Sequence, residues 1–244
     1  MKRTASIFAA SLLMGAVCAS PAFAGPSASG GGASTSGYNS IPSKVSGNVA
    51  SIGFEATQTT EFGDAVALSG RNRTLSSMTV VLSSWACETG AWNGSCQTTP
   101  GAIFNVPITF TIYDGTGSTA LATQAQSVAV EYRPSASPQC VGGDAGKWYN
   151  AKDKTCYNGF PQTVTMAMSP MTLPDNVIWS VKYGTYSSNG NVSGPADSLN
   201  VGAFSFPNAP YSGTDLNADE AFRNGAMEAG WTGNRPLGAV TTVK

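Results

Sequence analysis

Apolar and polar side chains alternate along much of this 244-residue chain, and that period of two restricts its fold more than any other feature. The alternating segments are rich in Val, Ile, Thr and aromatic residues, and they comprise 65–68, 78–82, 106–113, 127–132, 163–168, 177–183 and 199–204. Side chains spaced in this way point to opposite faces of a β-strand. We therefore expect an all-β fold, a two-sheet antiparallel β-sandwich of jelly-roll-like topology.

Glycine, proline and short polar residues separate the alternating segments. Ser69–Arg73 is expected to link the first two strands, and Asp114–Thr119 is expected to form the tip of a hairpin. We expect helix only at Asp219–Ala229, and there no more than one or two turns.

The first 24 residues have the pattern of an export signal. Lys2 and Arg3 precede a short apolar run at 7–17, and Ala22–Ala24 has the small-x-small form that signal peptidase requires. A membrane anchor is the alternative, but this run is much shorter than the ~20 residues of a spanning helix. A lipid anchor on Cys18 is disfavoured because no leucine stands three positions before it. We expect cleavage before Gly25.

The remaining chain is expected to contain a flexible Gly/Ser-rich leader at 25–40 and a single β-sandwich domain at 41–244. Cleavage removes two of the 13 basic residues and none of the 14 acidic ones, which leaves a mildly acidic protein. Such a chain lacks the basic surface that nucleic acid or anionic lipid requires. The mature chain is expected to be secreted or periplasmic, with no insertion into a membrane.

Four cysteines remain after cleavage, and export favours disulfides between them. Each sequential pair brackets a Gly-, Asn- or Asp-rich stretch typical of a loop, so we expect Cys87 to pair with Cys96 and Cys140 with Cys156. A zinc site is the alternative. It is disfavoured because neither pair has the Cys-x2-Cys spacing of zinc ligands.

Histidine is absent from the chain, which excludes Ser-His-Asp and Cys-His catalysis and histidine-ligated metals. Two carboxylates suffice for glycoside hydrolysis, and the first half of the chain supplies Glu55, Glu61, Asp64 and Glu88. Their isolated positions on strands and turns are more typical of solvated or turn-capping groups. We therefore expect no enzymatic activity.

No cofactor is expected, although a structural calcium ion remains open. Asp215, Asn217 and Asp219 match the first half of a calcium loop, but Glu220 replaces the required glycine and Ala226 the final bidentate glutamate. That loop is rejected. Asp64 and Asp114 stay as candidate calcium ligands in a different site.

Aromatic residues gather at the two cysteine loops, where Trp85, Trp92, Trp148, Tyr149 and Tyr157 lie in or beside them. Flat rings held on stapled loops stack against sugar rings, while neighbouring Asn, Asp and Gln bind the hydroxyls. The alternative is that these rings cover the ends of the sandwich core. They are our candidate ligand-binding residues.

Two stretches, Glu61–Gly70 and Arg73–Val80, resemble an FGD-x-hydrophobic-x-L-x-G strand pair found in secreted and surface-sorted (PEP-CTERM-type) bacterial proteins of unassigned function. Further stretches at 84–88, 132–135, 156–160 and 197–201 resemble uncharacterised exported bacterial β-sandwich proteins. The resemblance implies export and a β-sandwich, and it implies no catalytic residues. Because no apolar sorting helix precedes Lys244, we expect release rather than surface anchoring.

The leading hypothesis is a secreted, non-catalytic binding or surface-interaction module, with a glycan or cell-surface component as its partner. Two alternatives stay open. The first is a structural component of an envelope or extracellular matrix, which the low charge and abundant Gly, Ser and Thr favour. The second is a carboxylate-based glycan hydrolase or lyase.

Overall fold

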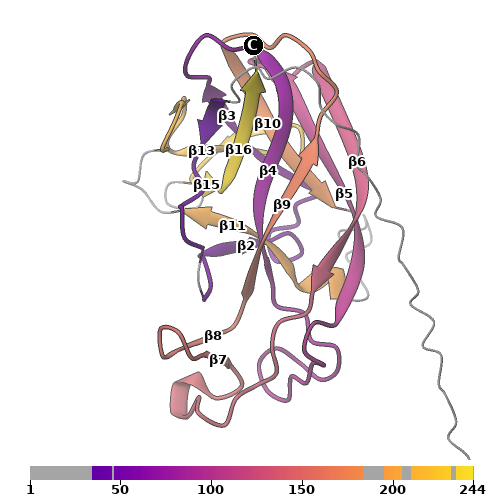
Figure 1. Ribbon diagram of the computed structural model, residues 1–244, viewed down its shortest axis with the longest axis vertical. Helices are drawn as coiled ribbons and strands as arrows, with labels where there is room; N and C mark the ends of the chain where they lie inside the picture. The colour runs from indigo at the N-terminus through magenta and orange to yellow at the C-terminus, as the bar shows by residue number, and fades with distance from the viewer. Residues whose placement is uncertain (1–34, 46, 184–194, 205–209, 232–234, 244) are drawn as a thin grey trace, which may run out of the picture. The chain divides into compact units, whose positions relative to one another are not determined.

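A computed structural model of the chain describes residues 35–45, 47–183, 195–204, 210–231 and 235–243. The predicted signal peptide lies outside these residues, as does most of the predicted leader. Within them the fold is all-β, as the alternation predicted, with two large antiparallel sheets packed as a β-sandwich (Figure 1).

Eight strands form the centre of the two sheets. One sheet has the order β1 (Thr35–Asn39), β16 (Gly238–Val243), β4 (Thr74–Ser84), β9 (Phe160–Ala167). The facing sheet has the order β3 (Glu61–Ala67), β10 (Asn176–Tyr183), β5 (Ile103–Asp114), β6 (Ala120–Glu131). Counted along the chain, these are strands 1-8-3-6 opposite 2-7-4-5, which is the strand order of a jelly roll.

Shorter strands extend this frame. The additions to the first sheet are β2 (Ser51–Gly53), β11 (Leu199–Phe204) and β15 (Arg235–Pro236), and those to the second are β12 (Thr214–Asp215), β13 (Glu220–Arg223) and β14 (Ala226–Ala229). A separate ribbon pairs β7 (Trp148–Asn150) with β8 (Thr155–Tyr157), and short 3-10 turns lie at Gly142–Asp144 and Pro195–Ser198. The described residues contain no helix with the length and apolar character to cross a membrane.

The core lies between the two sheets and follows from the alternation. In β5, Phe104, Val106 and Ile108 are buried while the residues between them are exposed. Leu82 of β4 and Trp179 of β10 belong to the same buried cluster, so side chains from both sheets meet there. Burial of a large apolar side chain contributes about 1.5–3 kcal/mol, and this cluster therefore supplies most of the driving force for folding.

The predicted strands are present, and the hairpin tip at Asp114–Thr119 joins β5 to β6. Residues 65–68 and 78–82 do not pair with each other, because β3 and β4 belong to opposite sheets. The prediction of a flexible leader was wrong at its end. Residues 35–39 form β1, and Tyr38 is fully buried there.

The helical turns predicted at Asp219–Ala229 were also wrong. These residues form the β13–β14 hairpin, with Asn224 at φ 51° and Gly225 at φ 90° in its turn. Two successive residues with positive φ make the type of turn that Asn-Gly favours between antiparallel strands. The Asn224-Gly225 dipeptide was therefore a stronger signal for a hairpin than the rest of this segment was for helix.

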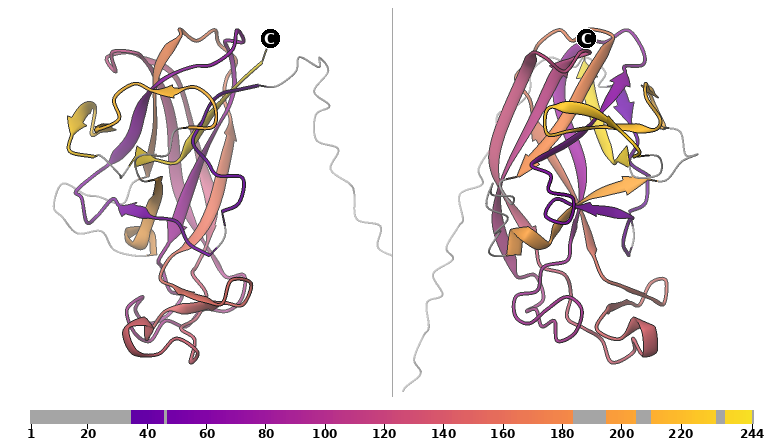
Figure 2. Two further views of the ribbon diagram at one scale, coloured as in Figure 1. Left: turned by 90° about the vertical axis from the view of Figure 1, so that its left-hand side faces the viewer. Right: turned by 180° about the vertical axis from the view of Figure 1, so that it is seen from behind.

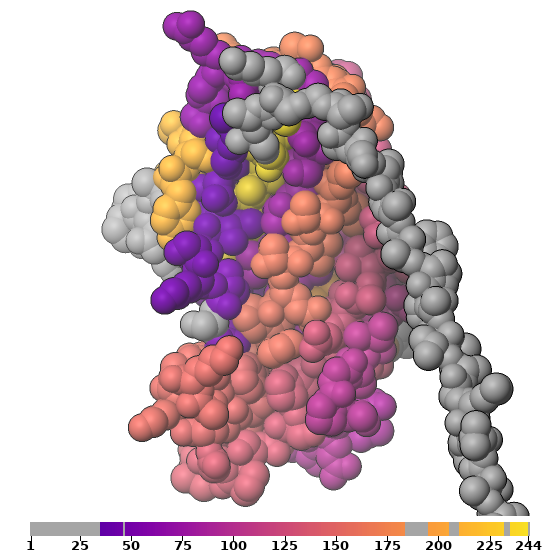
Figure 3. All heavy atoms as spheres, in the orientation of Figure 1, coloured from indigo at the N-terminus to yellow at the C-terminus, as the bar shows by residue number. Residues whose placement is uncertain are grey.

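Three connections of the jelly roll run through one end of the sandwich: β1 to β3, β4 to β5 and β6 to β9. The views from the side and from behind show the cysteine-bearing connections 85–102 and 132–159 together at that end (Figure 2). In the space-filling view they lie side by side below the strands, magenta and salmon respectively (Figure 3). We call this region the loop end.

Candidate functional site

Two disulfides close the connections of the loop end. Cys87 bonds Cys96 within the β4–β5 connection, and Cys140 bonds Cys156 within the β6–β9 connection. The local pairing predicted from the sequence is confirmed. In a chain-entropy account each bond restricts the unfolded chain and stabilises the fold by about 3 kcal/mol.

A buried arginine joins the two disulfide loops. Arg133 is 0% exposed, and its guanidinium donates to the carbonyl of Trp92 at 2.8 Å, to that of Gly146 at 2.8 Å and to that of Pro134 at 3.2 Å. Trp92 belongs to the first loop and Gly146 to the second. Among the described residues no carboxylate forms an ion pair with Arg133. Burial lowers the pKa of Arg133 to about 10, which leaves the side chain charged at neutral pH.

Backbone hydrogen bonds from the residues after Arg133 also connect the two loops. We call residues 132–138 the strut. The Ala136 N–H donates to the Cys96 carbonyl at 2.9 Å, and the Ser137 N–H donates to the Lys147 carbonyl at 2.9 Å. At Gly146, with φ 86°, a Cβ atom would approach the backbone of Asn93 to 3.1 Å. The two loops are therefore in contact and fixed to one strut.

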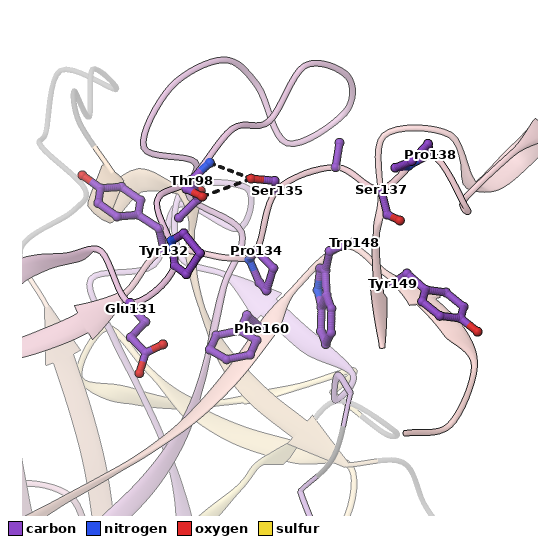
Figure 4. A pocket seen from close by; sticks show the side chains of 13 residues that line it. Thr98, Glu131, Tyr132, Pro134, Ser135, Ser137, Pro138, Trp148, Tyr149 and Phe160 are labelled. Atoms are coloured by element: carbon purple, nitrogen blue, oxygen red, sulfur yellow. Dashed lines mark hydrogen bonds between the residues drawn. The ribbon is translucent and has the colours of Figure 1, made fainter. Parts of the chain in front are cut away.

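A pocket of about 480 Å³ opens beside the strut. Rings form most of its wall, and the polar groups lie around them (Figure 4). Its lining residues include Pro134, Trp148, Tyr149 and Phe160, with Thr98, Glu131, Ser135 and Ser137 as polar members. We call this the aromatic pocket. Its size and its mix of rings with a few polar groups are typical of small-molecule sites.

Trp148 forms a fixed wall of the aromatic pocket. Only 7% of the residue is exposed, and its indole N–H donates to the Gly159 carbonyl at 2.8 Å. The Phe160 ring packs edge-on against it, with a centroid separation of 5.6 Å. Tyr149 extends from the same strand toward the outside (Figure 4). Phe160 and Tyr149 therefore lie on opposite sides of Trp148, and each could contact a ligand there (Figure 4).

A second aromatic group, the tryptophan pair, consists of Trp85 and Trp92. Their rings meet edge to face at a centroid distance of 5.0 Å, and Trp92 is 42% exposed. Two depressions of about 420 and 430 Å³ border the pair and share Asp197 and Ser198. Tyr132 of the strut lines both the first of these depressions and the aromatic pocket. The two aromatic groups are therefore neighbours.

Carboxylates and an amide border the tryptophan pair. Glu88 lines one depression, and Glu55 and Asn200 line the other. The Thr99 N–H donates to the Glu88 carboxylate at 2.7 Å, and this bond lowers the pKa of Glu88. An ionised carboxylate accepts hydrogen bonds from hydroxyls, whereas a proton-donating acid needs a raised pKa.

Four of the five predicted aromatic residues line the aromatic pocket or the two depressions, and Tyr157 lines none of them. The Tyr157 ring fills the space beside Gly47, where a Cβ atom would come within 2.4 Å of it, and its hydroxyl donates to Asp153 at 3.0 Å. Tyr157 therefore braces the loop end. Trp148 combines both predicted roles, because it packs against neighbours and also lines the aromatic pocket.

The two candidate calcium ligands, Asp64 and Asp114, accept hydrogen bonds from backbone N–H groups. Asp114 caps the β5–β6 turn, where its Oδ1 accepts the N–H groups of Thr116 at 3.2 Å and Ser118 at 3.1 Å. Asp64 is fully buried in β3 and accepts the N–H of Ala65. In the described part of the chain no three acidic or thiol groups cluster as a metal site would require.

Asp64 also faces a buried ion pair between Asp215 and Arg235. Burial raises the pKa of Asp64 well above the ordinary value of an aspartate, and the charge of Asp215 raises it further. Asp215, the first residue of the rejected calcium loop, thus binds the guanidinium of Arg235, which lies over the Phe204 ring.

Sequence reasoning missed Arg133, Pro134 and Phe160 as parts of the site. A single arginine carries no sequence signal that it will be buried against backbone carbonyls. Pro134 lies three residues after β6 and Phe160 begins β9, and neither position has a distinctive sequence signal. Their role follows from the jelly-roll topology, which brings the end of β6 beside the start of β9.

Comparisons with protein-family models, with curated proteins and with solved structures found no match to this chain. The geometry of the site is therefore the guide to what it binds.

Proposed function

We propose that this protein is an exported, non-catalytic carbohydrate-binding module whose primary ligand site is the aromatic pocket. The observation that carries the proposal is a pocket of about 480 Å³ with ring walls and polar groups, on a loop end fixed by two disulfides and a buried arginine. Its volume suits one or two sugar rings.

The chemistry of the pocket matches both faces of a sugar. The C–H face of a pyranose would stack on the exposed ring of Tyr149 or on Phe160, which lie on either side of Trp148, since ring faces bury apolar surface. Glu131 and Ser137 at the same pocket would bind hydroxyl groups, one as an acceptor and the other as a donor or acceptor. Fixed rings lose little conformational entropy when the ligand binds, which favours affinity.

The tryptophan pair would extend the site for a longer glycan. Trp92 presents a ring face to solvent, and Glu88, Glu55 and Asn200 border it with hydrogen-bonding groups. Because its pKa is lowered, Glu88 suits recognition of hydroxyls better than protonation of a glycosidic oxygen.

A glycan array probed with the purified exported protein should identify a ligand, and calorimetric titration should then measure its affinity. Tyr149→Ala should weaken binding about tenfold, equivalent to about 1.4 kcal/mol, and Trp92→Ala should weaken binding of longer glycans more than of short ones. The matched control is Tyr211→Ala, which removes a tyrosine that is 68% exposed beside Asn39, away from the loop end. It should bind like the unaltered protein.

Three outcomes would count against the proposal. Absence of any glycan ligand on a broad array would reject it. Equal weakening by Tyr211→Ala would place the binding surface elsewhere. Release of reducing ends from a bound glycan would identify a hydrolase and overturn the non-catalytic part.

Export is the second part of the proposal. Two disulfides fit an oxidising compartment, and the Ala22–Ala24 pattern supplies the route. Intact-mass measurement of the protein from a bacterial periplasm or medium should give a chain that begins at Gly25. A mass that retains Met1 would contradict cleavage there.

A further inference from the structure

The lateral edge of the second sheet is a strand of unusual length and composition. β6 spans Ala120–Glu131 and borders only β5, so its other side is an open edge. Both Figure 1 and the view from behind place it at the margin of the sandwich (Figure 2). From Ala120 to Val130 it contains no charged residue and no proline. Natural edges usually carry such residues, because they prevent pairing with other strands.

The margins formed by β1, β9, β14 and β15 are shorter strands, and some of them carry a charge or a proline. β14 has four residues and includes Glu228, and β15 has two residues. β1 has five residues, and β9 contains Pro161, which has no N–H to offer. β6 lacks these features.

The hydrogen bonds at the end of β6 show which of its backbone groups face outward. The Tyr132 N–H points to β5 and donates to the Ala102 carbonyl, whereas both backbone groups of Glu131 point the other way, to the Gln162 amide at 3.0 and 2.9 Å. Along a strand, the backbone N–H and C=O groups of successive residues point alternately to one side and to the other. The outward residues are therefore Thr123, Ala125, Ser127, Ala129 and Glu131.

Glu131 is capped by the side chain of Gln162, and the Ala125 carbonyl accepts a bond from the Gln124 amide at 3.3 Å. Thr123, Ser127 and Ala129 have no such cap in the described part of the chain, and each is exposed. A row of backbone donors and acceptors is thus presented to solvent over about 20 Å, at about 3.3 Å per residue.

We infer that β6 is an interaction surface for a second copy of this chain, which pairs with it edge to edge in antiparallel orientation about a two-fold axis at Gln126. In this register Thr123 lies opposite Ala129 of the other copy and Ala125 lies opposite Ser127. The outward groups of Thr123, Ala125, Ser127 and Ala129 then find partners, with about eight interchain hydrogen bonds. The two Gln126 side chains meet at the axis.

Charge and side-chain size favour a second copy over a foreign peptide. In the antiparallel register the two Glu131 carboxylates stand about 33 Å apart, so they do not repel at close range. Strand addition of foreign peptides draws its specificity from side-chain pockets. From 123 to 129 the outward side chains of β6 are Thr, Ala and Ser, which form no pocket but match each other across a symmetric pair.

Sedimentation velocity over a range of concentrations tests this inference on the purified exported protein. The unaltered chain should form a dimer as its concentration rises. Ala125→Lys/Ser127→Lys should weaken dimerisation more than tenfold, because the lysine introduced at position 125 of each copy would face the lysine introduced at position 127 of the other. Ala125→Glu/Ser127→Glu should do the same, and an equimolar mixture of the two variants should restore the dimer.

The matched control is Thr214→Lys/Ala229→Lys, which adds the same charge at exposed positions on β12 and β14, on the opposite side of the sheet from β6. It should dimerise like the unaltered chain. In the unaltered chain, amide exchange at Ser127 and Ala129 should slow as concentration rises, which tests the interface without a substitution.

A monomer at every concentration would overturn the inference. So would a dimer that the charged β6 variants leave intact, or one that the control alone disrupts. Concentration-independent protection of Ser127 and Ala129 would show instead that another segment of the same chain covers the edge.

Discussion

The sandwich body and the loop end of this protein are held together by different forces. In the body, side chains such as Phe110, Leu82 and Trp179 are fully buried, and paired strands satisfy the backbone. At the loop end, two disulfides and one arginine that binds carbonyls replace an extended apolar core. The difference explains how rings remain accessible there: they are positioned by polar and covalent ties and are not all needed to form a core.

The largest expected effect comes from the body. Phe110→Ala should lower the free energy of unfolding by about 4 kcal/mol, because it removes a fully buried ring and leaves a cavity. Chemical denaturation monitored by circular dichroism measures this. The loop end should unfold in the same transition, since its connections have no scaffold without the strands. A loop end that stays ordered after the sheets unfold would break the comparison.

The next largest loss of unfolding free energy is expected when a disulfide is removed. Cys140→Ser/Cys156→Ser opens the larger loop, with a sequence separation of 16, and should cost about 3 kcal/mol. Cys87→Ser/Cys96→Ser, with a separation of 9, should cost slightly less. Thermal unfolding of both variants ranks them. A loss at the smaller loop that clearly exceeds the loss at the larger one would contradict the entropic account.

Arg133→Met tests the polar tie between the loops. It should cost about 2 kcal/mol, because the carbonyls of Trp92 and Gly146 lose their donor in a buried place. Hydrogen exchange should accelerate at 88–96 and 140–156 and stay slow in the strands. Arg71→Met, which alters an exposed turn arginine, is the control and should change neither region. Faster exchange throughout β4 and β5 would show that Arg133 supports the body as well.

The smallest effect is a pH dependence within the body. The pKa of Asp64 is raised by burial and by Asp215, so the folded chain keeps a proton that the unfolded chain releases above about pH 4. Asp64 therefore makes the free energy of unfolding fall as pH rises from about 4 toward its folded pKa.

Asp64→Asn removes that titration. Relative to the unaltered chain, the variant should gain unfolding free energy as the pH rises from about 4 to about 8, measured by urea denaturation at both values. Parallel pH profiles for the two proteins would show that Asp64 is ionised in the folded state.

Local patterns in the sequence predicted the body well. Alternation in β5 and β9 predicted both the strands and their buried faces, and the spacing of the cysteines predicted the two disulfides. These features depend on neighbours in sequence. The errors arose where a local signal was overlooked, as at Asn224-Gly225, or where a distant strand decided the outcome, as for Thr35–Asn39 beside β16.

The loop end was harder to predict because its contacts are long-range. The sequence pointed to Trp85, Trp92, Trp148 and Tyr149, all of which line depressions in the structure. It did not indicate which of them pack inward, since a ring in a loop has the same sequence signal in both roles. The role of Arg133 could not be predicted for a related reason: its partners are backbone carbonyls, which every residue carries.

The most direct test of the account uses the five indole N–H signals in a ¹H–¹⁵N spectrum of the protein, titrated with its glycan. Trp85, Trp92 and Trp148 belong to the loop end, whereas Trp179 and Trp231 pack in the body. The account predicts that the signals of Trp148 and Trp92 shift on binding while those of Trp179 and Trp231 stay unchanged. Shifts confined to the body tryptophans would contradict it.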